Sequence, residues 1–267
     1  MNIPFTRPAA VAGLFYPGDA RALRGGVISL LSAQHGGVAA PKALIVPHAG
    51  YVYSGPVAAS AYAALEKSAP AIRRVVMFGP AHRVWVRGLA VSSAGEFATP
   101  LGMVPVDRQA IAAVEHLPQV EINDEAHAEE HSLEVQLPFL QMLLDDFAVA
   151  PFVVGGATPA QVAEVMETLW GGPETLIVVS SDLSHYLPYA EAQLIDRATA
   201  DSILERRPLS RHEQACGATP INGLIEVARR KGLAPRLLDL RNSGDTAGDR
   251  SRVVGYGAFA FAEHGHD

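Results

Sequence analysis

The sequence predicts an α/β fold: a single three-layer domain in which helices flank a central mixed, mostly parallel sheet. The first observation is a series of short apolar runs, each long enough for one strand. They lie at residues 43–46 (ALIV), 74–78 (RVVMF), 147–154 (FAVAPFVV) and 175–179 (TLIVV). Runs without a polar face are typical of strands buried on both sides, as in parallel sheets. The second observation is that helical patterns alternate with these runs, which favours parallel strands joined by helices.

The predicted helices carry end signals in the sequence. They are expected at residues 55–67, 132–144, 159–169, 190–206 and 219–231. Ser54 precedes the first helix as a candidate N-cap, and Thr158 followed by Pro159 opens the third. A hydroxyl at this position accepts a hydrogen bond from the free N–H groups of the first turn. Gly232 follows the last helix, where a left-handed residue often ends the helix.

Two further segments are expected to add strands. Residues 252–262 (RVVGYGAFAFA) alternate like a strand. Gly255 and Gly257 within this segment indicate a bulge or the close approach of another part of the chain. Residues 89–106 predict an antiparallel excursion around Gly95 and residues 100–102 (PLG).

Composition indicates a large folded core. Apolar residues make up 49% of the 267 residues and charged residues 18%, proportions that exclude wholesale disorder. No repeat or low-complexity linker divides the chain. We therefore expect one domain over residues 1–267, with a loose tail at 263–267.

Charge and cysteine content restrict the partners and the compartment. The formal net charge is −7, and the basic residues are scattered rather than clustered. Nucleic acids and anionic membranes select concentrated positive charge, so we expect neither as a partner. The single cysteine excludes an intrachain disulfide and fits a reducing compartment. The amino terminus lacks a signal-peptide pattern, and no run reaches about 18 apolar residues, so we expect a soluble, cytoplasmic protein.

Three of the ten histidines follow predicted strands at similar places. They are His48 in VPHAGY, His82 in FGPAH and His185 in VVSSDLSHY. Ligands of open α/β sheets bind beyond the carboxyl ends of the strands. One such histidine is ordinarily just a loop residue, but three in the same setting indicate a shared site. Imidazole suits iron, copper and zinc, so the sequence predicts a metal-binding edge.

Cys216 is harder to interpret from the residues alone. It lies in ACGATP, just before a predicted helix. A free cysteine is usually a small apolar core residue. The position before a helix start can instead lower the pKa of its thiol. Both interpretations stay open at this point.

A second histidine group is HAEEH at residues 127–131. His127 and His131 are four residues apart, so one helix can present both to a metal. The pattern also matches the H-x-x-E-H motif of inverted zinc proteases, with Glu130 as the general base, although nothing singles out a third ligand. An acidic, solvent-exposed helix start is the structural alternative. We favour His131 near the site and His127 outside it.

Seven short motifs follow one another over nearly the whole chain. They are RPAAVAGLFYP (7–17), VPHAGYVYSG (46–55), GPAH (79–82), EHSLEVQLPFL (130–140), SSDLSHY (180–186), ACG (215–217) and VVGYG (253–257). Each is ordinary alone, but seven in this order are specific. Together they resemble the Memo family, whose microbial members are called AmmeMemoRadiSam system protein B.

The resemblance implies a fold similar to the class III extradiol ring-cleavage dioxygenases. In those enzymes two histidines and a glutamate hold non-haem Fe(II), and another histidine serves as acid and base. By motif, His48 and His82 match the two histidine ligands and His185 the acid/base. Cys216 stands where the dioxygenases have the glutamate. The resemblance therefore implies one transition-metal ion on His48, His82 and Cys216, with iron(II) first and copper or zinc as alternatives.

The cysteine changes the chemistry that the resemblance implies. A thiolate is softer than a carboxylate, suits copper and zinc as well as iron, and can itself be oxidised. Memo proteins share this ligand set and are associated with iron or copper redox chemistry. We expect a metal-dependent redox enzyme related to the dioxygenases; the alternative is a non-catalytic metal- or peptide-binding protein. Human-type members read CGR where this chain has Cys216-Gly217-Ala218, so a cationic group near the pocket is missing.

Five further residues are candidates for the pocket. His131 and Glu134 would begin a helix beside it, and Asp182 would orient a neighbouring group. Tyr16 and Tyr51 either close over the mouth or pack in an aromatic core. The expected ligand is a small molecule or a peptide. The name of the microbial members implies a functional link with an AMMECR-type protein and a radical SAM protein.

Overall fold

Four parallel strands form the centre of the sheet in the computed structural model, which describes residues 5–34 and 40–263. In spatial order they are β2 (Ala43–Val46), β9 (Thr175–Ser180), β3 (Arg74–Pro80) and β8 (Ala148–Val154). Nearly every residue in them is buried, which accounts for the apolar runs in the sequence. The four strands predicted from these runs are confirmed to within two residues at each end.

Antiparallel strands extend the sheet and make it mixed. On one side β12 (Val253–Ala262) pairs with β2, and both β10 (His185–Leu187) and β11 (Ala234–Asn242) pair with β12. On the other side β4 (Leu89–Val91) runs antiparallel to β8 and parallel to β7 (Val120–Ile122). The strand predicted at the C-terminal end is therefore confirmed as β12.

A second, three-stranded sheet lies beside the first. It contains β1 (Thr6–Arg7), β5 (Glu96–Thr99) and β6 (Gly102–Pro105). Thr99 pairs with Gly102 across the turn of the β5–β6 hairpin, as predicted for the antiparallel excursion. β1 pairs parallel with β5 and thus ties the N-terminal segment to this hairpin.

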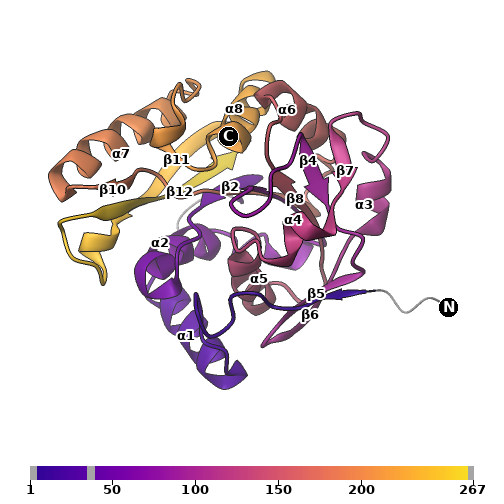
Figure 1. The fold of residues 1–267 in the computed structure, drawn as a ribbon, viewed down its shortest axis with the longest axis horizontal. Coiled ribbons are helices and arrows are strands. Elements are labelled where there is room, and N and C mark those ends of the chain that lie inside the picture. Colours follow the sequence, from indigo (N-terminus) through magenta and orange to yellow (C-terminus); the bar gives the residue numbers. More distant parts are fainter. Residues whose placement is uncertain (1–4, 35–39, 264–267) are drawn as a thin grey trace.

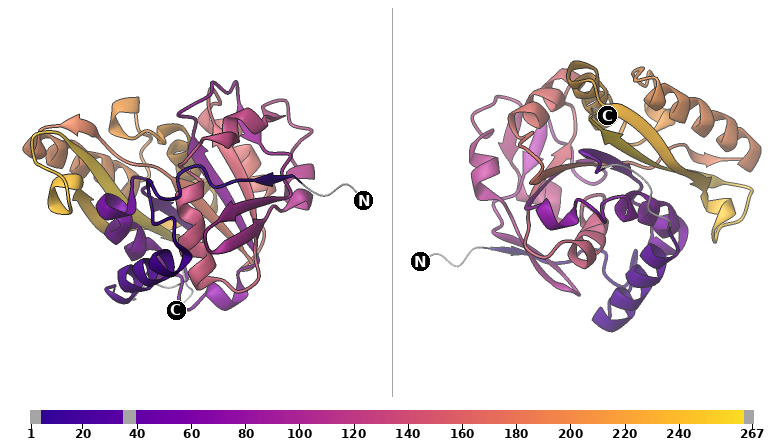
Figure 2. Two further views of the ribbon diagram at one scale, coloured as in Figure 1. Left: turned by 60° about the horizontal axis from the view of Figure 1, so that its bottom comes forward. Right: turned by 180° about the vertical axis from the view of Figure 1, so that it is seen from behind.

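Helices cover both faces of the large sheet. They are α1 (Ala20–Ser32), α2 (Tyr51–Ala63), α3 (Arg108–Ala112), α4 (Asp124–Ala128), α5 (Leu137–Leu143), α6 (Pro159–Thr168), α7 (Tyr189–Leu204) and α8 (Ala218–Lys231). Figure 1 shows α6, α7 and α8 on one side and α1, α2 and α5 on the other, and Figure 2 shows the same layers from other directions. The predicted three-layer α/β domain is confirmed. No helix in the described residues is long and apolar enough to cross a bilayer.

Two of the predicted helix ends are confirmed. Thr158 caps α6 in a reciprocal capping box with Gln161, and Gly232 ends α8 in the left-handed conformation at φ 69°. The prediction of Ser54 as a cap was wrong, because α2 already begins at Tyr51, with Gly50 as its N-cap. The carbonyl of Phe15 accepts the N–H of Tyr51, a tertiary partner that local sequence signals do not reveal.

Three other segments differ from expectation. The single helix predicted at 132–144 was wrong, since a 3-10 turn, η2 (Glu134–Gln136), precedes α5. No helix was expected over α1, because two glycines at its centre disfavour helix formation. The helix forms nevertheless, with Asp19 as its N-cap and with Leu23 and Val27 buried. β11 was also missed because it is mostly half-buried. Most of the tail predicted at 263–267 lies outside the described residues.

Candidate metal site

The parallel strands bring three predicted site residues to one edge. His48 follows β2, His82 follows β3 and Asp182 follows β9, each by two residues. Because β9 lies between β2 and β3, the two histidines flank the end of β9. The sheet order therefore joins positions that are far apart in the sequence.

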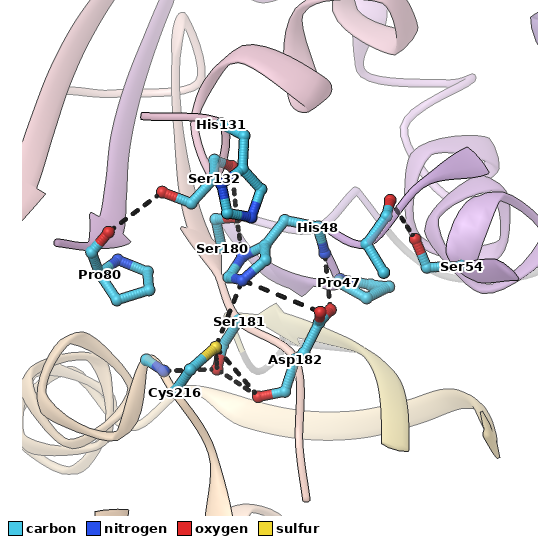
Figure 3. A network of polar contacts seen from close by, with 12 residues as sticks. Pro47, His48, Ser54, Pro80, His131, Ser132, Ser180, Ser181, Asp182 and Cys216 are labelled. Atoms are coloured by element: carbon cyan, nitrogen blue, oxygen red, sulfur yellow. Dashed lines mark hydrogen bonds and ion pairs between the residues drawn. The ribbon is translucent and has the colours of Figure 1, made fainter. Parts of the chain in front are cut away.

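His48, His82 and His131 form a cluster that could hold a metal ion. One ring nitrogen from each lies within 4.8 Å of the others. The ring of His131 stacks on that of His82 with centroids 4.7 Å apart, and His48 meets both rings edge-on. Figure 3 shows His48 between His131 and Cys216. His131, which sequence analysis assigned to the pocket, thus lies in the cluster itself.

Hydrogen bonds determine which nitrogen of His48 is free. Ser180 donates its hydroxyl proton to the carbonyl of Ser132 at 2.6 Å and accepts from the Gln136 amide at 3.0 Å. The 2.8 Å contact between Nδ1 of His48 and Oγ of Ser180 must therefore have Nδ1–H as the donor. Burial, with the electrostatic effect of His82 next, lowers the pKa of His48 to about 3, so the ring is neutral. Its Nε2 keeps a lone pair.

Glu130 holds the ring of His82 through Nδ1, as Ser180 holds that of His48. Its carboxylate accepts from the backbone N–H of His82 at 2.7 Å and contacts Nδ1 of the ring at 2.9 Å. Burial opposes ionisation of Glu130, but hydrogen bonds from His82 and Ser132 outweigh it and lower the pKa to about 2. An ionised carboxylate only accepts, so Nδ1–H of His82 donates to it and Nε2 is the nitrogen left for a ligand. Carboxylate–imidazole pairs of this kind orient histidine ligands in metal sites.

His131 has a different environment. Its buried Nδ1 has no hydrogen-bond partner among the described residues, and Oε1 of Glu130 lies 3.5 Å away. The ring packs against Phe15 with centroids 4.7 Å apart. Burial, followed by the electrostatic effect of His48, lowers its pKa to about 4. A neutral imidazole with a buried nitrogen that has no partner is suited to contact a bound ion or small molecule.

Cys216 lies beside His48. Its Sγ is 3.3 Å from Nε2 of His48, in a loop held against the end of β9. A side chain at Gly217 would bring Cβ within 2.7 Å of Ser181, so this close approach requires glycine. Of the two open interpretations of Cys216, a pKa lowered by the helix start is wrong: burial, followed by the negative charge of Asp182, raises the thiol pKa to about 12.

Asp182 supports the loop that carries His48. Its Oδ1 accepts the backbone N–H of His48 at 2.8 Å, and Oδ2 lies 3.9 Å from Nε2 of the same residue. Burial raises the pKa of the Asp182 carboxyl, while the N–H groups of His48 and Ala49 oppose the rise. The carboxyl group therefore helps to fix the backbone between β2 and α2.

His185 begins β10 and lies outside the three-histidine cluster. Its Nδ1 lies 2.9 Å from the carbonyl of Leu183. A carbonyl cannot donate, so Nδ1 carries the proton and Nε2 is left to accept one. Electrostatic interaction with His185 lowers the pKa of both His48 and Asp182, so His185 is a neighbour of the cluster.

Glu134 and the two tyrosines bind the N-terminal segment. Glu134 is fully buried and accepts from the guanidinium of Arg7, from the N–H groups of Ala10 and Val11, and from the hydroxyl of Tyr16. The hydroxyl of Tyr51 donates to the carbonyl of Val135 at 2.6 Å, and its ring packs against Tyr16. These contacts anchor residues 7–16 over the segment that carries Glu130 and His131.

His127 does not join His131 at a metal. α4 ends at Ala128, so the two histidines are not on one helix. Nε2 of His127 contacts the carbonyl of Ala90 at 2.9 Å and must donate its proton there. Since Glu130 holds His82, the zinc-protease interpretation of HAEEH does not match the geometry.

Comparison with known proteins agrees with the motifs. A family profile described as Memo-like protein matches residues 7–260. A MEMO1 family protein of Aeropyrum pernix is 38% identical over 94% of this chain and 98% of its own length. Proteins of the same name from Aquifex aeolicus (36%, covering 94% and 97%) and Metallosphaera sedula (34%, covering 96% and 99%) are also similar. The chain belongs to the Memo family. Its family membership agrees with the resemblance found from the seven motifs.

Some residues of this Memo-family site gave no clear signal in the sequence. Ser180 and Gln136, which fix the His48 ring, lie in β9 and η2; both belong to quoted motifs, but nothing in those motifs indicated their role. Glu130 was singled out, but as a protease base rather than as the partner of His82. Arg7, buried against Glu134, lies within a matched motif, which is the signal that could have identified it.

Proposed function

We propose that this chain is a metal-dependent redox protein that holds one transition-metal ion, iron(II) first, at the edge of its sheet. The ligands would be Nε2 of His48, Nε2 of His82 and the sulfur of Cys216. The bound ion would supply Lewis acidity and electron exchange, which none of these side chains provides. Copper and zinc are the alternatives, because imidazole and thiolate suit all three metals.

The observation that carries the proposal is the pair of fixed tautomers. Ser180 and Glu130 each accept a hydrogen bond from Nδ1–H of one histidine, which leaves Nε2 as the nitrogen that can bind a metal. The two histidine rings would then need little rearrangement when the metal ion binds. The Cys216 thiol, 3.3 Å from Nε2 of His48, adds a donor that a cation would convert to thiolate. Because burial raises the pKa of this thiol to about 12, binding of a metal to it should release a proton.

His185 would transfer protons for the reaction. Its Nδ1–H is held by the carbonyl of Leu183, so the opposite nitrogen, Nε2, is the atom that would accept and return a proton. Asp182 would keep the His48 loop in place during the reaction through its bond to the backbone of His48. The substrate would be a small molecule with a chelating group.

Anaerobic loading with cobalt(II) tests the ligand set. The wild-type protein should bind one ion, release a proton and gain a sulfur-to-cobalt charge-transfer band. Cys216→Ser should lose the band, and His131→Gln should keep it. A band that survives in Cys216→Ser, or that disappears in His131→Gln alone, would contradict Cys216 as the third ligand.

Oxygen consumption tests the redox assignment. The iron(II)-loaded protein should take up oxygen with members of a panel of catechols and related chelating diols, and His185→Gln should slow this uptake without changing metal content. Metal bound at unit stoichiometry, with no uptake beyond oxidation of Cys216, would instead identify a metal-binding protein without turnover.

A further inference from the structure

A cavity of about 450 Å³ opens beside two of the proposed ligands. His82 and Cys216 both line it, together with the loop after β3 and the turn at Gly155 and Gly156. Cavities of this volume accommodate small molecules rather than folded partners. A ligand in this cavity would therefore lie against the candidate metal site.

Arg83 sets the charge of this cavity. Among the described residues that line it, Arg83 is the one that carries a formal charge, and no aspartate or glutamate accompanies it. Within residues 5–34 and 40–263, no hydrogen bond or ion pair engages the Arg83 guanidinium. Arg87 on the same loop instead donates to the carbonyl of Pro118. Position 218, where human-type members have an arginine, is Ala218 in this chain. Arg83 thus provides a cation from a different loop.

Trp85 gives the same rim a flat apolar surface. Its side chain is 78% exposed, whereas the neighbouring Val86 is completely buried. The loop is held at both ends, because Ala81 donates to the carbonyl of Val154 and Gly156 donates to that of Val86. A large aromatic side chain left in water on an anchored loop is a surface on which a planar group can stack.

We propose that the ligand of this cavity is a small aromatic carboxylate, bound through its carboxylate by Arg83 and through its ring by Trp85. The inference deepens the proposed function and rests on it, since it names the substrate class of the same site. A guanidinium matches the two oxygens of a carboxylate in a planar, bidentate arrangement. With one arginine as the formally charged residue of the lining, a carboxylate monoanion balances the charge better than a phosphate dianion does.

Calorimetric titration with benzoate and benzamide tests the inference, because the two probes share a ring and differ in charge. Metal content is determined first, and both probes are then titrated into metal-free and metal-loaded protein. Wild type should bind benzoate about fivefold more tightly than benzamide, the size expected for a partly exposed charged pair. Arg83→Gln should remove this preference, and Arg83→Lys should restore part of it. Trp85→Ala should weaken both probes equally.

Arg87→Gln is the matched control, since it removes the same charge from the same loop outside the cavity. An equal benzoate preference in wild type and Arg83→Gln would overturn the inference, as would an equal loss in Arg87→Gln. Failure of the proposed function is distinguishable because it would appear in the metal content, before any probe is added. In that case the metal-free titrations would still decide whether Arg83 binds the carboxylate.

Discussion

His127 and His131 belong to the same five-residue motif yet have opposite environments. His127 is buried with its ring edge-on to that of Phe97, and its Nε2 donates to the carbonyl of Ala90. His131 lies against His48 and His82, and its Nδ1 has no partner among the described residues. Burial lowers the pKa of both to about 4. Their protonation is therefore alike, and what separates a structural histidine from a histidine of the candidate site is the partner of the ring nitrogen.

The comparison extends to His48 and His82. In each, one nitrogen is occupied by Ser180 or Glu130, and the other remains available at the cluster. In His127 the hydrogen bond from Nε2 to the carbonyl of Ala90 serves only to satisfy a buried polar group. The hydrogen-bond partner of each ring, rather than the presence of a histidine, thus defines this site.

The largest expected effect contrasts the two regions directly. His48→Ala should lower the metal affinity to less than about one-hundredth of the wild-type value. The change removes a metal ligand itself rather than a residue that only hydrogen-bonds to a ligand. His127→Ala should keep metal at unit stoichiometry and lower the free energy of unfolding by about 3 kcal/mol through the cavity it leaves. Elemental analysis and urea denaturation measure the two quantities. Loss of metal in His127→Ala would revive the zinc-protease arrangement.

A smaller effect is expected from the partner of His82. Glu130→Gln should weaken metal binding about ten- to hundredfold, because an amide cannot accept from both His82 groups as the carboxylate does. Glu129→Gln is the matched control: the neighbouring side chain is exposed and lies outside the cluster. Competition with a chelator measures both affinities. If Glu130→Gln binds metal like Glu129→Gln, the assignment of Glu130 as the support of His82 is wrong.

The smallest effect concerns His127 and pH in the metal-free protein. Burial lowers its folded-state pKa from 6.5 to about 4, so the unfolded state binds more protons between these values. Stability is therefore lost as pH falls from 6.5 towards 4. His127→Gln, which can still donate to Ala90, should lose about 2 kcal/mol less than wild type between pH ~7 and pH ~5. Urea denaturation at both pH values measures the difference; equal losses would contradict a neutral, buried His127.

The sequence by itself determined the central architecture. Four apolar runs predicted the parallel strands, because strands buried on both faces carry few polar residues. The local signals at Thr158 and Gly232 predicted helix ends correctly, since both act within one turn of the chain. His48 and His82 were identified by their position after strands, and the seven motifs indicated the family before any comparison.

The tertiary structure decided what each side chain does. Strand order placed β9 between β2 and β3 and so brought His48 close to His82, a relation that no local pattern encodes. The start of α2 depended on Phe15, and the roles of Ser180, Glu130 and Arg83 depended on neighbours from other segments. Hydrogen-bond partners and burial arise between distant parts of the chain. The sequence therefore named the candidate histidines, and only the fold determined which nitrogen each of them leaves free.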